Sequence, residues 1–211
     1  MAFLQDHMLI DRPLQADIVA RCLAGNFGDE PSHAAHALGN ISLPDGSVKP
    51  VWLCHAADAV LLDDFGQTLL ITRLHNPGRG KQALPGGLLD EVDGRTESSH
   101  TAALREAMEE TGISAEVLAK ADIRQLGRRR YNRPFDIRSA WNNLPGTPVQ
   151  KGDFFTVSTL GFRIKIPGNL QDVALLAGDD ATAVHVVDIA SLKAGQFAVP
   201  DHLEMIREAL A

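Results

Sequence analysis

The sequence predicts an α/β protein with an N-terminal extension, and three observations support this. An apolar hairpin pattern covers residues 59–74, a helical pattern covers residues 99–111, and further strand-like segments precede a helical pattern at the C-terminus. The chain has 211 residues, which is enough to bury a substantial core. The predicted division is a helix and strand extension over residues 1–50, followed by one domain over residues 51–211.

The extension begins with a predicted helix, because apolar residues recur at helical spacing from Leu14 to Leu23 and Gly25 follows as a stop signal. Residues 41–53 then read as two short strands around a Pro-Asp-Gly turn. The extension could complete a substrate pocket, make a homodimer contact or form a structural cap. The sequence leaves these three roles open.

The domain begins with two apolar runs around a polar turn, which predict a β-hairpin. The following helix has its apolar positions on one face, and Gly112 is placed to end it. The remaining predicted elements are strands at residues 153–166 and 183–189 and a helix from Asp201 that buries Leu203, Ile206 and Leu210.

Composition and charge narrow the classes of function. The net charge is −7 and the pI is about 5.6, so the overall electrostatics do not favour nucleic acid or an anionic membrane surface. No apolar run reaches the roughly 18 residues of a membrane span, and the N-terminus lacks the basic start of a signal peptide. We expect a cytoplasmic protein. Cys22 and Cys54 lack Cys-x-x-Cys spacing, which predicts buried thiols rather than a zinc or disulfide site.

Acidic residues gather on one face of the predicted helix at residues 99–111. At about 100° per residue, Glu106, Glu109 and Glu110 fall within an arc of roughly 100°. Such a face suits Mg²⁺, which binds a few carboxylates, keeps several waters and leaves positions for phosphate oxygens. The alternative is a solvated acidic face, because like-charge neighbours on a helix cost only a few tenths of a kcal/mol. The upstream turn at residues 85–87 favours the metal site, because glycine backbone can approach a ligand closely.

The segment LPGG…E…REAMEETGI resembles the Nudix box, in which a glycine-led loop precedes a helix reading Arg-Glu-apolar-x-Glu-Glu-x-Gly-apolar. The helix half runs from Arg105 to Ile113, with the small Ala107 at the usual aliphatic position. The resemblance implies an α/β/α sandwich with a central mixed sheet. It also implies a hydrolase that cuts the pyrophosphate bond of a nucleoside diphosphate derivative.

The resemblance further implies a metal site and a set of catalytic residues. Glu106, Glu109 and Glu110, with the Gly87 carbonyl, would bind one or more Mg²⁺ or Mn²⁺ ions that bridge the diphosphate and activate a water. Without metal, the clustered acids should raise one another's pKa. Arg105, beside Glu106, belongs to the same set.

The family's loop glutamate has two candidates in this sequence. Glu97 stands eight residues before Arg105 but ten after Gly87, an apparent insertion of four residues, whereas Asp93 keeps the spacing from Gly87. We prefer Glu97 as the residue that orients Arg105, because the insertion can then lie in the loop LLDEVDGR, where extra length costs little.

The general base also has more than one candidate. The segment AGDDATAVHVVDI resembles a late Gly-Asp-Asp-Ala segment of many family members, which makes Asp180, or else Asp179, the candidate. An ordinary Asp-rich turn is the alternative. Glu106 could also act as both metal ligand and base.

Arginine and aromatic side chains downstream of the box suit a nucleotide ligand, because guanidinium groups bind phosphate bidentately and aromatic rings stack on bases. A solvated basic loop is the alternative. The predicted substrate-binding residues are Arg128, Arg130, Tyr131 and Arg138, with Gly86 in the glycine turn; Arg129, Arg133, Phe135 and Trp141 lie in the same stretch.

Residues downstream of the box bear on the substrate class. In the family, a proline some fifteen to eighteen residues past the box indicates ADP-ribose hydrolases and a tyrosine indicates dinucleoside polyphosphate hydrolases; Tyr131 and Pro134 leave this undecided. The stretch RPFDIRS resembles one in ADP-ribose-cleaving relatives, so we expect ADP-ribose or a nucleotide sugar. The alternatives are a non-catalytic nucleotide-sensing module and a dinucleoside polyphosphate or nucleotide-pool-sanitising pyrophosphatase.

Overall fold

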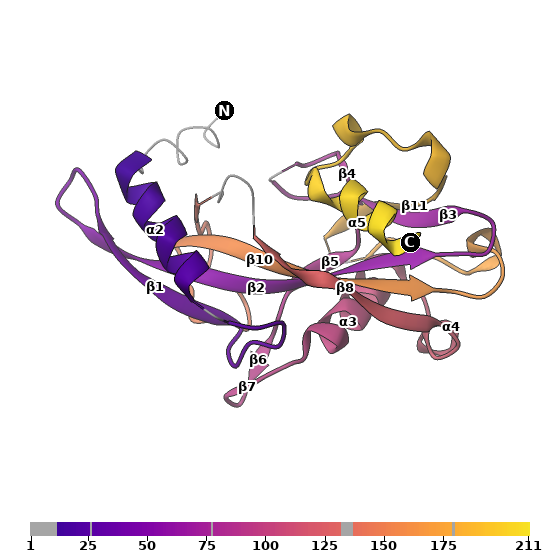
Figure 1. The fold of residues 1–211 in the computed structure, drawn as a ribbon, viewed down its shortest axis with the longest axis horizontal. Coiled ribbons are helices and arrows are strands. Elements are labelled where there is room, and N and C mark those ends of the chain that lie inside the picture. The colour runs from indigo at the N-terminus through magenta and orange to yellow at the C-terminus, as the bar shows by residue number, and fades with distance from the viewer. Residues whose placement is uncertain (1–11, 26, 77, 132–136, 179) are drawn as a thin grey trace. The chain divides into compact units, whose positions relative to one another are not determined.

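The computed structural model describes residues 12–25, 27–76, 78–131, 137–178 and 180–211, with side chains from residue 16 onward (Figure 1). The helices are α2 (Arg12–Ala24), α3 (Ser99–Thr111), α4 (Ala115–Leu118) and α5 (Asp201–Ala209), with 3-10 turns at Leu170–Asp172, Ile189–Ser191 and Ala194–Gln196. The strands are β1 (Ala35–Ser42), β2 (Val48–Leu62), β3 (Gln67–Arg73), β4 (Gln82–Ala83), β5 (Gly86–Leu88), β6 (Glu91–Val92), β7 (Arg95–Thr96), β8 (Asp122–Tyr131), β9 (Arg138–Ser139), β10 (Phe154–Lys165) and β11 (Ala181–Asp188).

A central sheet organises the domain. Its strands hydrogen-bond in the order β11-β3-β2-β10-β8, while β1 and β5 also pair with β2, β4 with β3 and β9 with β10. Helices α3 and α5 lie on opposite faces of this sheet (Figure 1). The predicted α/β/α sandwich with a central mixed sheet, preceded by an N-terminal helix, is therefore confirmed.

The chain forms two compact units. The first unit comprises residues 1–56, 88–99 and 129–159, and the second comprises residues 57–87, 100–128 and 160–211. In the first unit, α2 packs through Ile18 and Cys22 onto apolar residues of β1 and β2. In the second unit, one apolar cluster consists of Val60, Leu62, Leu70, Leu84, Leu126, Leu192, Phe197, Leu203, Met205, Ile206 and Ala209. The predicted boundary at residues 50 and 51 stays a prediction.

Most predicted elements are present, with three differences. The predicted strand after the Pro-Asp-Gly turn and the first strand of the hairpin are one continuous strand, β2, whose last residues are buried on both faces. Leu23 is 64% exposed, because Ile18 and Cys22 form the buried face of α2 instead. Leu210 is 57% exposed, because α5 ends at Ala209 and only Leu203 and Ile206 remain inside.

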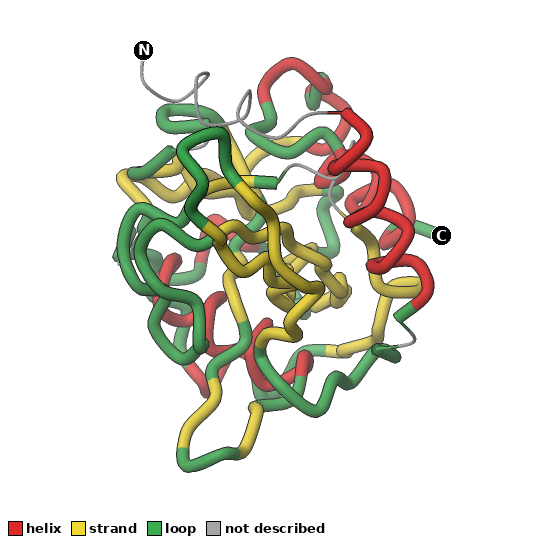
Figure 2. The backbone as a smooth tube through the Cα atoms, turned by 90° about the vertical axis from the view of Figure 1, so that its left-hand side faces the viewer, coloured by secondary structure: helices red, strands yellow, loops and turns green. Residues whose placement is uncertain are grey.

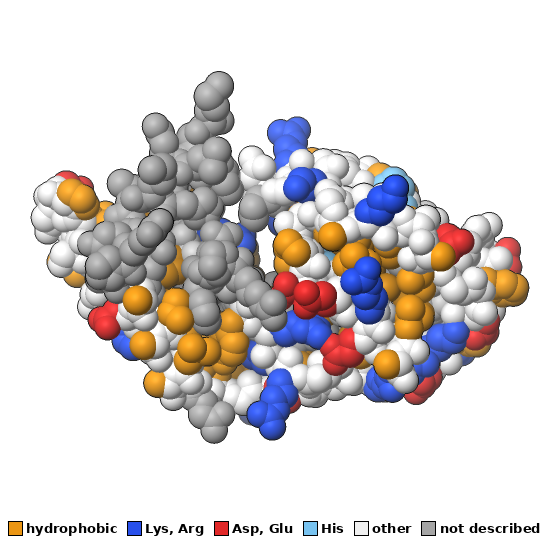
Figure 3. Space-filling view, turned by 45° about the horizontal axis from the view of Figure 1, so that its top comes forward, with side chains coloured by type: hydrophobic (Ala, Val, Ile, Leu, Met, Phe, Trp, Pro, Cys, Tyr) orange, Lys and Arg blue, Asp and Glu red, His pale blue; other side chains and the backbone are white. Residues whose placement is uncertain are grey.

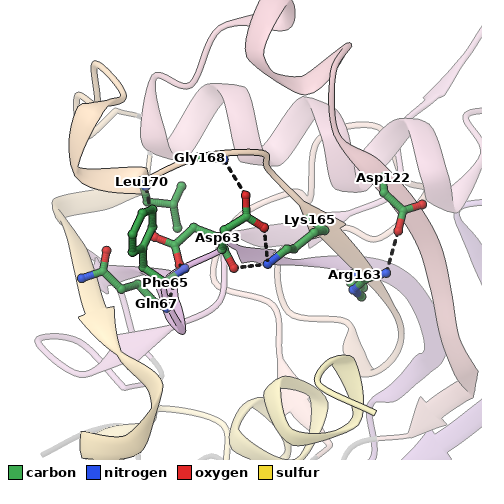
Figure 4. Close-up of polar contacts among 9 residues, drawn as sticks. Asp63, Phe65, Gln67, Asp122, Arg163, Lys165, Gly168 and Leu170 are labelled. Atoms are coloured by element: carbon green, nitrogen blue, oxygen red, sulfur yellow. Dashed lines mark hydrogen bonds and ion pairs between the residues drawn. The ribbon is translucent and has the colours of Figure 1, made fainter.

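The hairpin turn between β2 and β3 is held by two aspartates (Figure 4). Asp63 is 3% exposed; its Oδ1 accepts hydrogen bonds from the backbone N–H groups of Phe65 (2.9 Å) and Gln67 (2.8 Å), and its Oδ2 accepts one from Leu170 (3.1 Å). Lys165 forms an ion pair with Asp64 at 2.9 Å and also donates to the Asp63 carbonyl oxygen. The turn is thereby tied to the chain that follows β10.

The surface of the second unit mixes charge signs. On the right-hand part of Figure 3, Lys and Arg side chains lie among acidic and apolar ones. Of the described helices, none is both long and apolar enough to cross a bilayer.

Candidate active site

Helix α3 presents two buried acids and one exposed acid. Ala103 and Ala107 are fully buried and mark the face of the helix that packs inward. Glu106 and Glu110 lie beside this face and are only 7% and 3% exposed. The Glu109 side chain is 45% exposed. Gly112 ends the helix with a positive φ of 67°, and its N–H donates to the Met108 carbonyl at 2.9 Å.

The glycine turn before β5 lies directly against these acids. Glu110 Oε2 accepts a hydrogen bond from Gly86 N at 2.9 Å, and the Glu106 carboxylate covers the α-carbon of Gly87. A β-carbon on Gly86 would lie 2.6 Å from the Ala57 carbonyl oxygen and would also collide with Asp58, so this position has no room for a side chain. The structure therefore brings together the turn and two of the three acids predicted from the sequence.

Arg105 joins the third acid to the others. Its Nη1 lies 2.8 Å from Glu106 Oε1 and 2.9 Å from Glu109 Oε2. One guanidinium nitrogen therefore bridges two of the predicted metal ligands. The assignment of Arg105 to the catalytic set stays a prediction.

The environment of Glu110 makes its carboxylate hard to ionise. Burial raises the pKa of Glu110 to about 8, and the negative charges of Glu106 and Asp180 act in the same direction. The hydrogen bond from Gly86 and the positive charge of Arg73 oppose the increase. The expectation of a raised pKa holds for Glu110, although burial contributes more than repulsion between the acids.

The donor chemistry of this site fits a hard divalent cation. The candidate ligands are carboxylate and carbonyl oxygens, which Mg²⁺ and Mn²⁺ prefer, and the two buried carboxylates, Glu106 and Glu110, are close enough for the charge of one to raise the pKa of the other. As the side chains stand, however, no three His, Cys, Asp or Glu residues in the described part of the chain are gathered closely enough to hold a metal ion. The Glu109 carboxylate forms an ion pair with Arg105 at 2.9 Å.

Asp180, the candidate base, lies in a loop that packs on the C-terminal end of α3. In this loop, Leu176 N donates to the Thr111 carbonyl at 2.8 Å, and the Asp180 carbonyl accepts from Leu74 N at 2.8 Å. The Asp180 side chain is 61% exposed, and His75 Nε2 lies 3.5 Å from its Oδ1. Asp180 thus belongs to the electrostatic surroundings of Glu110. Asp179, the other candidate, lies outside the described residues.

The apparent insertion in the glycine loop is a small β-hairpin. β6 and β7 pair through Glu91↔Thr96 and Val92↔Arg95, apart from the main sheet (Figure 2). Asp93 and Gly94 form the tip, with φ values of 53° and 68°, the backbone of a type I′ turn. Asp93 is exposed at this tip.

Glu97 follows the hairpin directly. Its Oε1 accepts a hydrogen bond from Asp90 N at 2.8 Å, and its own N–H donates to the Asp90 carbonyl at 2.9 Å. This geometry favours Glu97 over Asp93 as the loop glutamate, because Asp93 stands at the end of an extra hairpin. The predicted partnership of Glu97 with Arg105 stays a prediction.

Arg129 has a structural position that the sequence did not indicate. It is 7% exposed; its Nη1 donates to the carbonyls of Ala56 and Ser158 at 3.1 Å each, and its Nη2 donates to the Asp29 carbonyl at 2.7 Å and to Ser99 Oγ at 2.6 Å. The expectation that Arg129 belongs to a phosphate-binding or solvated basic segment is therefore wrong. Residues 128–131 end strand β8, whose two buried positions, Leu126 and Arg129, are three residues apart, with Gly127 at a positive φ of 50° between them.

The predicted substrate-binding residues differ in exposure. Arg128 is exposed, Arg130 and Arg138 are half-buried, and Tyr131 packs against the apolar cluster of the first unit. The N–H of Gly86 is taken up by Glu110. Their contacts with substrate stay predictions. Arg133, Pro134 and Phe135 lie outside the described residues.

The opposite side of α3 borders an apolar pocket of about 320 Å³. Leu104 and Met108, on the side of the helix away from Glu106, are half-exposed and line this pocket. The pocket has no charged lining residue, so it cannot supply the predicted chemistry. Its lining is Leu104, Met108, Ala115, Leu118, Ala119, Ala121 and Ile123.

Comparisons with known proteins bear on the family and the fold of this chain. The family model described as "NUDIX domain" matches residues 53–206. The NUDIX domain of Shewanella oneidensis NrtR, solved in complex with ADP ribose, is 22% identical with a TM-score of 0.51, and the match covers 74% of this chain and 85% of that one. The E. coli dihydroneopterin triphosphate pyrophosphohydrolase is 14% identical with a TM-score of 0.50, over 73% and 92% of the two chains.

A MutT/nudix family protein from Enterococcus faecalis is 27% identical with a TM-score of 0.47; the match covers 74% of this chain but only 60% of that one. A search of curated proteins gives no match.

Proposed function

This chain belongs to the Nudix family, and from that premise we propose that it hydrolyses the pyrophosphate bond of a nucleoside diphosphate linked to another moiety, with Mg²⁺ or Mn²⁺ as cofactor. The family supports the enzyme class, a Nudix pyrophosphohydrolase. ADP-ribose or a nucleotide sugar is the proposed substrate.

One observation carries the catalytic proposal. The buried carboxylates of Glu106 and Glu110 both contact the Gly86-Gly87 turn, one over the Gly87 α-carbon and the other through the Gly86 N–H. A purely structural helix would gain nothing from burying two acids side by side, because each loses hydration and repels the other. The two buried carboxylates are therefore best explained as part of a site that binds a cation.

Each group around the turn has a defined part in the proposed reaction. Glu106, Glu109, Glu110 and the Gly87 carbonyl would hold the cation, which supplies charge neutralisation on the diphosphate and a more acidic water. Arg105 orients Glu106 and Glu109 through its shared Nη1, and the Gly86 N–H orients Glu110. Asp180 is the proposed acceptor of the proton that the attacking water loses, and its exposure lets it pass that proton to solvent.

The substrate proposal rests on the chain's own residues. A diphosphate carries charge that the exposed Arg128 and the half-buried Arg130 and Arg138 could bind, and the RPFDIRS stretch resembles ADP-ribose-cleaving relatives. The likeness to the Shewanella domain complexed with ADP ribose supports the fold alone, because the identity is 22%.

A hydrolysis assay on a panel of diphosphates tests the proposal. The panel would contain ADP-ribose, two nucleotide sugars, a dinucleoside polyphosphate and an oxidised nucleoside triphosphate, each with Mg²⁺, with Mn²⁺ and with chelator. We expect metal-dependent release of AMP and ribose 5-phosphate from ADP-ribose, and loss of this activity in Glu106→Gln. Turnover of only the last two compounds would favour the alternative pyrophosphatases. Tight ADP-ribose binding without any turnover would favour the sensing module.

A further inference from the structure

The backbone just before and within the glycine turn is held by the β-sheet and by both flanking helices. The Pro85 carbonyl accepts a hydrogen bond from Ala59 N in β2 at 2.8 Å, and Gly86 N donates to Glu110 in α3. The remaining contact comes from α5, where His202 Nδ1 accepts a hydrogen bond from Leu84 N at 3.0 Å. This hydrogen bond joins a side chain of the C-terminal helix to the backbone just before the turn.

His202 supplies the hydrogen-bond acceptor for Leu84 N, because the pairing of β4 with β3 has ended there. β4 pairs with β3 through Ile71↔Ala83 and Thr72↔Gln82, so Leu84 is the first residue beyond the ladder. Leu84 is 1% exposed, and a buried N–H without an acceptor is costly. α5 begins at Asp201, which places His202 in its first turn opposite this N–H.

The protonation state of His202 follows from its contacts. Because Nδ1 accepts a hydrogen bond, the ring carries its hydrogen on Nε2, which faces Asp58 Oδ2 at 3.6 Å. Burial lowers the pKa of His202, more than the negative charges of Asp58 and Asp201 raise it, while Arg73 adds to the lowering. His202 is therefore a neutral imidazole with one tautomer fixed by its neighbours.

Asp58 extends this contact to the glycines. Its Oδ1 lies against the α-carbon of Gly86, on the side where a β-carbon would collide with it, while its Oδ2 faces His202. His202 thus contacts the turn region in two ways. It accepts a hydrogen bond from Leu84 N, and it faces Asp58, which in turn contacts Gly86. The peptide units between Leu84 and Gly86 cannot shift without breaking one of these contacts.

We propose that His202 is a positioning residue for the hydrolysis: it fixes the Leu84 backbone and, through Asp58, holds Gly86 and Gly87 against Glu110 and Glu106. The inference rests on the proposed catalytic role of the glycine turn. His202 itself touches neither acid in this arrangement, so its effect is on geometry rather than on chemistry.

Two amide substitutions test the role of the Nδ1 position. In His202→Asn the side-chain oxygen can occupy the place of Nδ1, whereas in His202→Gln the longer side chain carries its oxygen toward the place of Nε2. Both variants keep a neutral polar group in the same cavity. Met205→Leu, a volume-conserving change at a fully buried position of the same helix, is the control for packing.

The readouts separate positioning from stability. Amide hydrogen exchange of Leu84, followed by NMR on the full chain without metal, should be roughly tenfold or more faster in His202→Gln than in wild type, and near wild type in His202→Asn. With substrate and Mg²⁺, kcat of His202→Gln should fall by about tenfold or more with KM within about threefold, because a small misplacement of the turn affects the reacting geometry. Met205→Leu should match wild type in both measurements.

Equal behaviour of the Asn and Gln variants, or wild-type exchange of Leu84 in His202→Gln, would overturn the inference. The exchange measurement does not depend on turnover. If the expected exchange difference appears but wild type hydrolyses nothing on the panel, the contact stands and the proposed hydrolysis fails.

Discussion

The carboxylate of Glu106 occupies the space beside Gly87 in which any other residue would place its β-carbon. The predicted glycine motif and the predicted acidic helix are therefore one packed unit, in which the missing side chain makes room for the acid. This relationship gives glycine at position 87 a steric reason that does not depend on backbone dihedral angles.

Gly87→Ala should reduce activity more than stability. The added methyl group collides with the Glu106 carboxylate and must displace it, so we expect kcat to fall by about tenfold or more. The measurement is kcat with ADP-ribose or the best panel substrate, beside the melting temperature. Gly195→Ala is the matched control, because a β-carbon there meets nothing within 4 Å. An unchanged kcat in Gly87→Ala would show that Glu106 is free to move.

Arg128 and Arg129 should separate substrate binding from folding. Arg129→Lys loses most of the hydrogen bonds to Ala56, Ser158, Asp29 and Ser99, and we expect a loss of roughly 3 kcal/mol or more in the free energy of unfolding.

Arg128→Ala should leave stability nearly unchanged and raise KM by about tenfold if the exposed guanidinium binds phosphate. Urea unfolding and steady-state kinetics on both variants measure this. A wild-type KM in Arg128→Ala would remove Arg128 from the substrate site.

Asp63 should contribute to stability through the β2–β3 turn. Asp63→Ala leaves the N–H groups of Phe65, Gln67 and Leu170 without their acceptor, and we expect a loss of roughly 2–4 kcal/mol in the free energy of unfolding. The exposed neighbour Asp64 is the comparison, and Asp64→Ala should destabilise less. Urea titrations of both variants give the difference. Similar losses for the two would contradict the structural role of Asp63.

His55 should make the protein sensitive to acid. Burial lowers its pKa from 6.5 to about 3, and the positive charge of Arg129 adds to this; the ring is hydrogen-bonded to Ser158 Oγ and His36 Nδ1, each at 2.9 Å. Between these pKa values the unfolded chain binds more protons, so the stability contributed by neutral His55 is complete above about pH 6.5 and decreases as the pH falls toward 3.

His55→Gln should therefore lose less stability than wild type between pH 7 and pH 4.5, although it is less stable at pH 7. Urea unfolding at several pH values measures the two slopes, and the difference should approach roughly 1.4 kcal/mol per pH unit for one proton. Parallel slopes for the two proteins would exclude His55 as a source of acid sensitivity.

Local sequence patterns were enough to predict the helices and strands that have a clear apolar periodicity. The helix at residues 99–111 and the hairpin around Asp63 follow from periodicity and turn residues, and both are present. The two-residue turn Asp93-Gly94 is a strong hairpin signal that the loop interpretation missed, because the flanking strands have only two residues each.

Contacts between distant segments could not be predicted in the same way. Arg129 lies among other arginines in the sequence, and only the fold shows that it is the buried one, three residues after the buried Leu126 in β8. His202 is 118 positions from Leu84, so no local pattern connects them. The ion pair between Arg105 and Glu109, by contrast, follows from their i,i+4 spacing on the helix. The contact of Arg105 with the adjacent Glu106 does not follow from helical spacing.

The most direct test of the account is the kcat of Glu110→Gln, compared with wild type and with Glu116→Gln, an exposed acid of α4, as control. Glutamine can still accept the hydrogen bond from Gly86 but cannot carry negative charge. We expect a folded variant whose kcat falls by at least ~10²-fold, as is typical when a transition-state charge stabiliser is lost. A kcat within about threefold of wild type, with the same metal dependence, would contradict the assignment of Glu110 and the site built around it.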